Sequence, residues 1–219
     1  MIADRLSHYR SVLPPEVTLV AVSKFQPIEA LHEAYAAGQR DFGENRVQEM
    51  CDKQGLMPSD VRWHQIGHLQ RNKVKYIAPF VHLIHSVDSE ALLDEINRQA
   101  EKVGRVIPCL LQVHIAREDS KFGLSPAELL ELCTDRQLQH YPHVHIQGLM
   151  GMASFTDNQQ VVRGEFDQLK RLFDQLQQFA LQRADMRILS MGMSDDFPLA
   201  LACGSNMVRI GSRIFGRRG

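Results

Sequence analysis

The residues best suited to chemistry in this sequence are Lys24 and two glycine- and serine-containing segments near the end of the chain. Lys24 directly follows residues 17–23, an uncharged and largely apolar run. A lysine amine whose pKa is lowered by desolvation or by neighbouring cations can attack a carbonyl and form a Schiff base. In residues 191–196 and 209–212, glycines let the backbone approach an anion, and serine hydroxyls add hydrogen-bond donors. Together these groups would suit a phosphorylated aldehyde.

Each of these residues also has a purely structural interpretation. A lysine at the end of a strand is commonly just solvated. Ser194 could cap a helix whose first turn favours Asp195 and Asp196. Gly211 and Ser212 could form a turn followed by a helix cap. The placement of these residues in the fold must therefore decide between the two interpretations.

The hydrophobic pattern alternates strands with helices about eight times, with short connections between them. Strands are expected at residues 17–24, 40–43, 61–66, 80–85, 106–115, 144–150, 188–191 and 207–210. Helices are expected at residues 2–13, 27–37, 44–51, 71–75, 89–103, 126–133, 158–183 and 195–203, and from residue 212 onward.

Eight strand–helix units without a linker or a change of composition predict one domain, residues 1–219, folded as a single (β/α)8 TIM barrel. An open doubly wound sheet is the alternative, although no Gly-x-Gly-x-x-Gly motif follows the first strand. In a barrel, the ligand site lies at the carboxyl ends of the strands, often with a phosphate between the loops after strands seven and eight. Lys24 and residues 191–196 and 209–212 follow strands one, seven and eight, so we expect them to meet there.

Composition excludes several classes of protein. The net charge is −1 and the longest basic run is two residues, which argues against a nucleic-acid binder. No apolar run approaches the length of a membrane span, and the charged first ten residues do not resemble a secretory signal. Four scattered cysteines suggest reduced thiols in the cytoplasm. His140, His143 and His145 lack a carboxylate or cysteine to complete a ligand set, so we expect no metal site.

Short motifs follow the expected strands in order: AVSK (21–24), FGENRVQE (42–49), WHQIG (63–67), LQxNK (69–73), DSKxG (119–123), GLM (148–150), MGMSxD (191–196) and VRIG (208–211). With these motifs the sequence resembles the YggS/PROSC family of pyridoxal 5′-phosphate (PLP) homeostasis proteins, and the resemblance runs from about residue 17 to the end.

The resemblance implies a fold-type III PLP-binding barrel like the N-terminal domain of alanine racemase. It makes Lys24 the lysine that holds the cofactor as an aldimine, and it places Arg209 opposite the pyridine nitrogen. It further implies a phosphate cradle of Ser194, Gly211 and Ser212, and ring contacts from Asn45 and Met150. Two positions depart from the family pattern: His68 replaces a usual proline, which affects the rigidity of its loop, and Ser212 replaces a usual threonine but keeps a donor.

The resemblance also bears on activity. Racemisation needs an acid or base on each face of the substrate, and Lys24 could serve one face. In the racemase the other base comes from a carboxyl-terminal domain of the partner subunit, which we do not expect in a chain that stops at Gly219. An arginine at the pyridine nitrogen also opposes its protonation. We therefore expect a protein that binds and buffers the cofactor without efficient catalysis, with no catalytic residues.

We expect that protein to act in intracellular PLP (vitamin B6) homeostasis, as a monomer in the cytoplasm. Its expected partners are the cofactor itself and apo PLP-enzymes that receive it, with no nucleic acid and no membrane. The alternative function is that of a small PLP-dependent amino-acid racemase.

Overall fold

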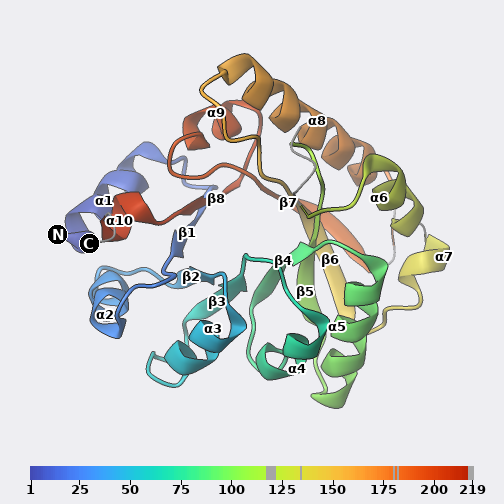
Figure 1. Cartoon of the computed structure of the whole chain (residues 1–219), viewed down its shortest axis with the longest axis horizontal. Coiled ribbons are helices and arrows are strands. Elements are labelled where there is room, and N and C mark those ends of the chain that lie inside the picture. Colours follow the sequence, from blue (N-terminus) through green and yellow to red (C-terminus); the bar gives the residue numbers. More distant parts are fainter. Residues whose placement is uncertain (117–121, 134, 180, 182, 217–219) are drawn as a thin grey trace.

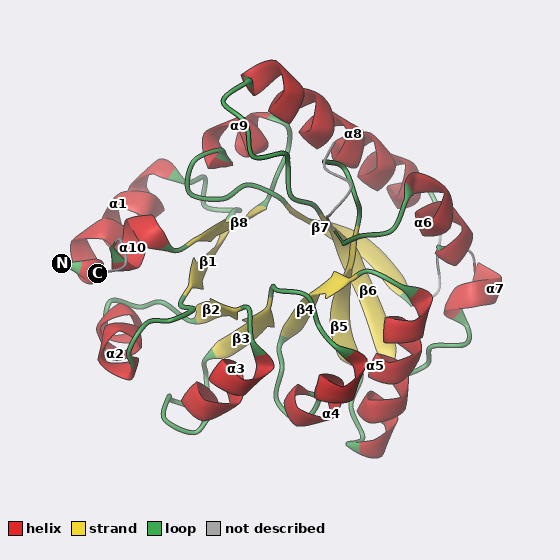
Figure 2. Ribbon diagram, in the orientation of Figure 1, coloured by secondary structure: helices red, strands yellow, loops and turns green. Residues whose placement is uncertain are grey.

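A computed structural model of the chain describes residues 1–116, 122–133, 135–179, 181 and 183–216. Strands β1 to β8 are all parallel and form a closed barrel, with β8 paired to β1 (Figure 1). Helices surround the ring of strands on the outside (Figure 2). The predicted (β/α)8 barrel is thus confirmed, and closure of the sheet excludes the open doubly wound alternative.

The strands have the following bounds: β1 Thr18–Val22, β2 Asp41–Glu44, β3 Arg62–Gln65, β4 Leu83–Val87, β5 Ile107–Gln112, β6 Val144–Met150, β7 Ala184–Ser190 and β8 Met207–Ile210. The helices described are α1 Ile2–Val12, α2 Ile28–Ala36, α3 Val47–Gln54, the 3₁₀ turn η1 Arg71–Lys73, α4 Val74–Ile77, α5 Glu90–Lys102, α6 Pro126–Leu132, α7 Asp135–Leu138, α8 Gln159–Gln177, α9 Phe197–Ala202 and α10 Ser212–Phe215.

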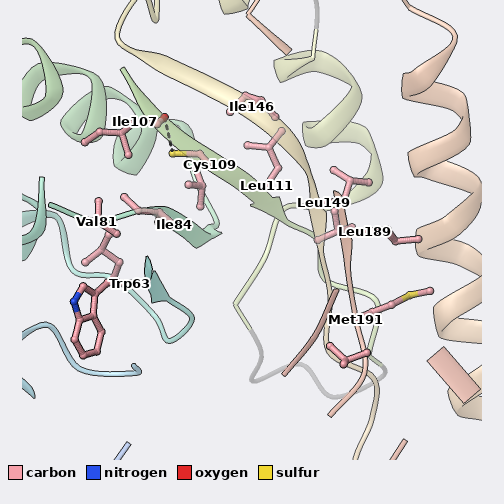
Figure 3. Packing of buried hydrophobic residues seen from close by; sticks show 14 of the residues in the cluster. Trp63, Val81, Ile84, Ile107, Cys109, Leu111, Ile146, Leu149, Leu189 and Met191 are labelled. Carbon is pink, nitrogen blue, oxygen red and sulfur yellow. Dashed lines mark hydrogen bonds between the residues drawn. The ribbon is translucent and has the colours of Figure 1, made fainter. Parts of the chain in front are cut away.

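Two hydrophobic clusters lie on the two faces of the barrel wall. The larger cluster fills the space between the strands and the helices. Figure 3 shows part of it, with Ile107, Cys109 and Leu111 of β5 near Ile146 and Leu149 of β6. The smaller cluster joins side chains from five different strands, which can meet only inside the barrel. Its buried members are Val20, Leu83, Leu110, Met150 and Met207.

The helix α8 shows how sequence periodicity produces these contacts. Its buried residues recur every three or four positions, so they form one stripe that packs against the barrel. The Asn158 side chain caps the helix by accepting hydrogen bonds from the backbone N–H groups of Gln160 and Val161, at 3.0 and 3.3 Å.

Two predicted boundaries were wrong in the same region. The predicted helix over 158–183 ends at Gln177, and the predicted strand over 188–191 begins at Ala184. The first four residues of β7 alternate between exposed and more buried positions, so they lack the continuous apolar pattern of a strand covered on both faces. The fourth strand likewise begins at Leu83 rather than residue 80.

The two ends of the described chain are adjacent. Helices α1 and α10 lie side by side (Figure 1), and Arg5 Nη1 donates a 3.1 Å hydrogen bond to the Ile214 carbonyl. No helix in the described part of the chain is both long and apolar enough to cross a membrane.

Candidate functional site

A cavity of about 460 Å³ lies at the carboxyl ends of the strands. This volume is within the usual range for sites that bind small molecules. Six of the seven residues expected to bind the cofactor line it: Lys24, Asn45, Ser194, Arg209, Gly211 and Ser212. The structure therefore brings together residues from the two ends of the chain, as the barrel topology predicted.

Strand register explains why these residues meet. Val22 pairs with Gly43 of β2, and Ala21 pairs with Ile210 of β8. Strand β1 ends at Val22, two residues before the predicted end of the strand, so Lys24 lies in the loop that follows it. Continuing this register places Asn45 beside Lys24 and Gly211 beside Val22, so the loops after β2 and β8 both reach the site.

The residue before Lys24 is fixed by buried ionic contacts. Ser23 Oγ donates a 2.6 Å hydrogen bond to Glu44 Oε1. Lys53 of α3 reaches the same place, donating to the Ser23 carbonyl and to Glu44 Oε1, both at 2.8 Å. Burial raises the pKa of Glu44, and the hydrogen bonds from Lys53 and Ser23 oppose that rise.

The residue after Lys24 is held by the same helix. The backbone N–H of Phe25 donates to Glu49 Oε1, and Lys53 Nζ donates to that oxygen at 2.7 Å. Phe25 has φ 62°, in the left-handed region that a bulky residue adopts only under constraint. Helix α3 therefore fixes the backbone on both sides of Lys24.

Arg209 is 4% exposed and forms part of the floor of the cavity. Its Nη1 donates to the Ser190 carbonyl at 2.9 Å and to Ser190 Oγ at 2.6 Å, and its Nη2 donates to the Gly151 carbonyl at 3.1 Å. Burial lowers its pKa to about 10, so the guanidinium remains charged at neutral pH. Because these three acceptors are uncharged oxygens, the positive charge remains available to a ligand in the cavity.

Asn45 is positioned by the loop after β3. Gln65 Nε2 donates to the Asn45 carbonyl at 3.1 Å and to the Gly67 carbonyl at 3.0 Å. A Cβ at Gly67 would lie 2.6 Å from the Asn45 carbonyl oxygen, so only glycine permits this approach.

The segments after β7 and β8 form the side of the cavity suited to phosphate. A Cβ at Gly211 would lie 2.9 Å from the Val22 carbonyl oxygen, so this glycine lets the strand-eight loop pack against β1. Helix α9 begins after Asp196, which is its N-cap residue, so the alternative assignment of Ser194 as the helix cap was wrong. Ser194 lines the cavity instead, together with Ser212.

Met150 is the one predicted residue that is not among those lining the cavity. It is fully buried in the cluster inside the barrel. Met152, two residues farther along the chain, lines the cavity and packs on that cluster. Because side chains alternate between the two faces of a strand, Met150 and Met152 point to the same face. Met152 is the later of the two and therefore lies nearer the cavity.

Several cavity residues were not identified from the sequence as ligand-binding groups: Gln26, Gln112, Phe122, Met193 and His68. His68 Nδ1 lies 2.9 Å from Asp88 Oδ2, and its ring stacks on Phe122 with centroids 3.9 Å apart. These contacts hold the loop where the family usually has proline. Lys121, another strand-end residue of interest, lies outside the described residues.

The charges of the cavity fit a phosphorylated ligand. Lys24 and Arg209 supply two cationic side chains, and none of the described lining residues is a carboxylate. A phosphate dianion would be repelled by carboxylates and stabilised by both cations. Glycine at 211 leaves space at the backbone, where N–H and hydroxyl groups can approach the anion.

Comparison with known proteins agrees with this geometry. Residues 1–219 match the family described as alanine racemase, N-terminal domain. The pyridoxal phosphate homeostasis protein of Pasteurella multocida is 42% identical over 207 residues, covering 92% of this chain and 87% of that protein. The one of Schizosaccharomyces pombe is 43% identical over 208 residues, covering 92% and 84%. The chain belongs to the pyridoxal phosphate homeostasis protein family.

Several solved structures have the same fold as this chain. PipY of Synechococcus elongatus PCC7942 without PLP is 42% identical, with a TM-score of 0.93 over 99% of this chain and 100% of that one. Its structure with PLP bound gives a TM-score of 0.90 over the same shares. Alanine racemase of Clostridium difficile 630 is 14% identical, with a TM-score of 0.81 over 99% of this chain and 59% of that one, and shares the fold.

Proposed function

We propose that the chain binds pyridoxal 5′-phosphate through Lys24 and acts in intracellular PLP homeostasis. The observation that carries this proposal is the meeting of Lys24, Arg209 and the Gly211 backbone around one cavity of about 460 Å³. A relative 42% identical has a structure described as having PLP bound. The cofactor, when bound, supplies an aldehyde that can condense with an amine and a ring that can accept electron density.

Each residue has a defined part in binding. Lys24 would hold the cofactor covalently: after its ammonium group loses a proton to solvent, the amine would condense with the aldehyde, forming a carbon–nitrogen double bond and releasing water. Ser194, Gly211 and Ser212 cradle the phosphate, and Asn45 contacts the ring. Met152 takes the place at the ring that the family resemblance gave to Met150. Arg209 lies at the ring nitrogen, held from behind by Ser190 and Gly151.

We further propose that the protein has no efficient catalytic activity. The cation of Arg209 opposes protonation of a ring nitrogen beside it, because two positive charges would then be adjacent. The protein would act as a monomer that supplies the cofactor to apo enzymes. The four cysteines are free thiols, which supports our placing it in the reducing cytoplasm.

The test is covalent attachment of PLP to the purified protein. Borohydride reduction after incubation with PLP should fix the cofactor on Lys24, as read by peptide mass, and a visible absorbance band should accompany the attachment. Lys24→Ala should abolish both signals. Lys75→Ala, which removes an exposed lysine, should leave them unchanged. A label on another lysine, or a band that survives Lys24→Ala, would place the site elsewhere.

The racemase alternative is tested on the same preparation. PLP-loaded protein incubated with single enantiomers of the common amino acids should leave their optical activity unchanged. Sustained turnover that is lost in Lys24→Ala would make the chain an enzyme and overturn the non-catalytic proposal.

A further inference from the structure

A chain of buried polar side chains crosses the inside of the barrel and ends at Arg209. His85 Nδ1 lies 3.2 Å from Ser190 Oγ, and His85 Nε2 lies 2.9 Å from His64 Nδ1. His64 Nε2 lies 3.0 Å from Asp41 Oδ1. Ser190 and His85 belong to β7 and β4, which are not neighbours in the barrel, so this contact spans its interior.

This series of hydrogen-bonded side chains connects the two ends of the barrel. Asp41 is the first residue of β2, at the end opposite the cavity, whereas Ser190 is the last residue of β7, at the cavity end. His64 and His85 are the third residues of their strands and are 1% and 0% exposed. The sequence of contacts therefore passes from one mouth, through the packed interior, to the floor of the cavity.

The hydrogen bonds of the chain have one consistent direction. The Asp41 carboxylate can only accept, so His64 donates from Nε2 and its neutral Nδ1 accepts. His85 then donates from Nε2 to His64, which leaves His85 Nδ1 as an acceptor for the Ser190 hydroxyl. The Ser190 oxygen in turn accepts from Arg209 Nη1. Every polar atom in this series is satisfied when both imidazoles are neutral and carry the proton on Nε2.

Charges around the chain favour this arrangement. Burial lowers the pKa of His85 well below its ordinary value, and the positive charge of Arg209 acts in the same direction. Burial by itself raises the pKa of Asp41, but hydrogen bonds from Arg62 and His64 outweigh it and hold the carboxyl ionised. The Asp41 carboxylate is thus fixed as an acceptor, and this sets the direction of the hydrogen bonds from His64 to Ser190.

A metal at the far mouth is a less satisfactory explanation. Asp41, His64 and His82 bring possible ligand atoms within 4.8 Å of one another. However, Arg62 donates to both oxygens of Asp41, at 2.7 and 2.5 Å, and Arg105 adds positive charge beside His82. A cation would have to displace Arg62 and approach a second arginine. The carboxylate is therefore better assigned to the hydrogen-bond chain.

We propose that Asp41, His64, His85 and Ser190 are positioning residues that orient the Arg209 guanidinium toward the bound cofactor. This proposal rests on the proposed function, because it assigns Arg209 to PLP. It also makes the cavity sensitive to the opposite mouth. If His64 Nδ1 donated to His85 instead of accepting from it, His85 would have to reverse its own hydrogen bond with Ser190.

The groups that face the two imidazoles define this sensitivity. His85 is faced by His64 from β3, Ser190 from β7 and Arg209 from β8. The exposed His82, directly before β4, lies beside His64, with ring centroids 5.4 Å apart and ring planes inclined at 56°. His64 is also faced by Asp41, whose partner Arg62 has a side chain 45% exposed. Solvent therefore reaches the chain at its Asp41 end.

The first experiment needs neither a variant nor the cofactor. Long-range ¹H–¹⁵N correlation spectra of the imidazole rings should show both His64 and His85 as neutral Nε2–H tautomers at pH 7. An Nδ1–H tautomer, or a charged ring, at either position would overturn the directional chain. Since this measurement is independent of PLP binding, it tests the direction of the hydrogen bonds through His64 and His85 even if the proposed function fails.

The second experiment removes the Ser190 hydroxyl, which lies between His85 and Arg209. Ser190→Ala should weaken PLP retention about tenfold, the usual scale for losing one hydrogen bond to a charged group. It should also shift the pH midpoint of the visible absorbance band, while borohydride still fixes PLP on Lys24. Ser190→Thr keeps the hydroxyl and should recover most of the wild-type behaviour.

Ser86→Ala is the matched control. Ser86 is equally buried on β4, and its hydroxyl is a buried group with no hydrogen-bond partner among the described residues. The control should retain PLP within about twofold of wild type, with an unchanged pH midpoint. If Ser190→Ala behaves like Ser86→Ala in both measurements, the hydrogen bonds from Asp41 to Ser190 have no effect on the cofactor and the proposal fails.

Discussion

Two buried polar networks lie next to the cavity, and they differ in the groups that hydrogen-bond to their buried cation. On the outside of the barrel, Lys53 of α3 contacts Glu44 and Glu49 at 2.8 and 2.7 Å and fixes the residues on both sides of Lys24. Inside the barrel, Arg209 is held by uncharged oxygens of Ser190 and Gly151, with the buried imidazole of His85 behind Ser190. One network hydrogen-bonds its buried cation to carboxylates, and the other hydrogen-bonds its cation only to uncharged oxygens.

This difference follows from what each network must hold. The Lys53 network positions backbone atoms, so its charges can neutralise one another within the protein. The Arg209 network presents a charge to a ligand, and a carboxylate partner would cancel the attraction for that ligand. Burial of this cation has a cost, seen in the pKa of Arg209, which is lowered to about 10 although the charge of Asp196 partly offsets the effect of burial.

The largest effect is expected when the paired network is broken. Lys53→Met should lower the free energy of unfolding by about 3 kcal/mol, because it leaves the buried Glu44 carboxylate without its cation. Lys53 is 7% and Glu44 is 0% exposed. Urea unfolding measures the loss. PLP attachment should also weaken, because the Ser23 carbonyl loses its donor.

Two further variants make this prediction specific. Lys170→Met removes a similar pair with Asp174 whose side chains are 36% and 46% exposed, and it should change stability by less than about 1 kcal/mol. Adding Glu44→Gln to Lys53→Met should recover part of the loss, since the unpaired charge is then gone. Equal effects of Lys53→Met and Lys170→Met would refute the importance of burial.

The two networks should respond to acid with opposite signs. His85 has a folded pKa well below 6.5, so the unfolded chain binds more protons below that pH, and stability falls as the pH falls. Glu44 has a folded pKa raised above 4.5, so its contribution grows as the pH falls toward that value. Each group can change the free energy of unfolding by at most about 1.4 kcal/mol per pH unit.

Unfolding free energies of two variants between pH 7 and pH 5 separate these contributions. His85→Gln should flatten the acid-induced loss of stability, and Glu44→Gln should make the loss steeper. His140→Gln, which replaces an exposed histidine, should leave the slope unchanged. A slope in His85→Gln equal to that of wild type would mean that His85 does not stay neutral in the folded protein.

The networks also mark the boundary of what the sequence could predict. Periodicity and the barrel rule placed Lys24, Asn45, Arg209 and Gly211 at one mouth, because every parallel strand ends on the same side. The histidine chain carries no local signal, since the contact of His85 with Ser190 joins residues 105 positions apart. This contact between β4 and β7 forms only because the sheet closes into a barrel.

Two other features illustrate the same limit. Lys53 lies beyond the predicted helix over 44–51, so its place on the same face as Val47 and Met50 becomes evident only because α3 extends to Gln54. The choice between Met150 and Met152 depends on how far β6 extends, and its pairing with β7 shifts register between Ile146 and Gly148. Such irregularities depend on neighbouring strands, so a single strand's sequence cannot reveal them.

The smallest effect is expected where the same chemistry is exposed. His68 contacts Asp88 at 2.9 Å, but the His68 side chain is 40% exposed, so solvent competes for the bond. His68→Ala should lower the free energy of unfolding by about 0.5–1 kcal/mol, including the lost stacking on Phe122. Asp88→Asn keeps a side-chain oxygen that can still accept the bond, and should cost less. If His68→Ala were as damaging as Lys53→Met, exposure would not be what separates strong from weak pairs in this protein.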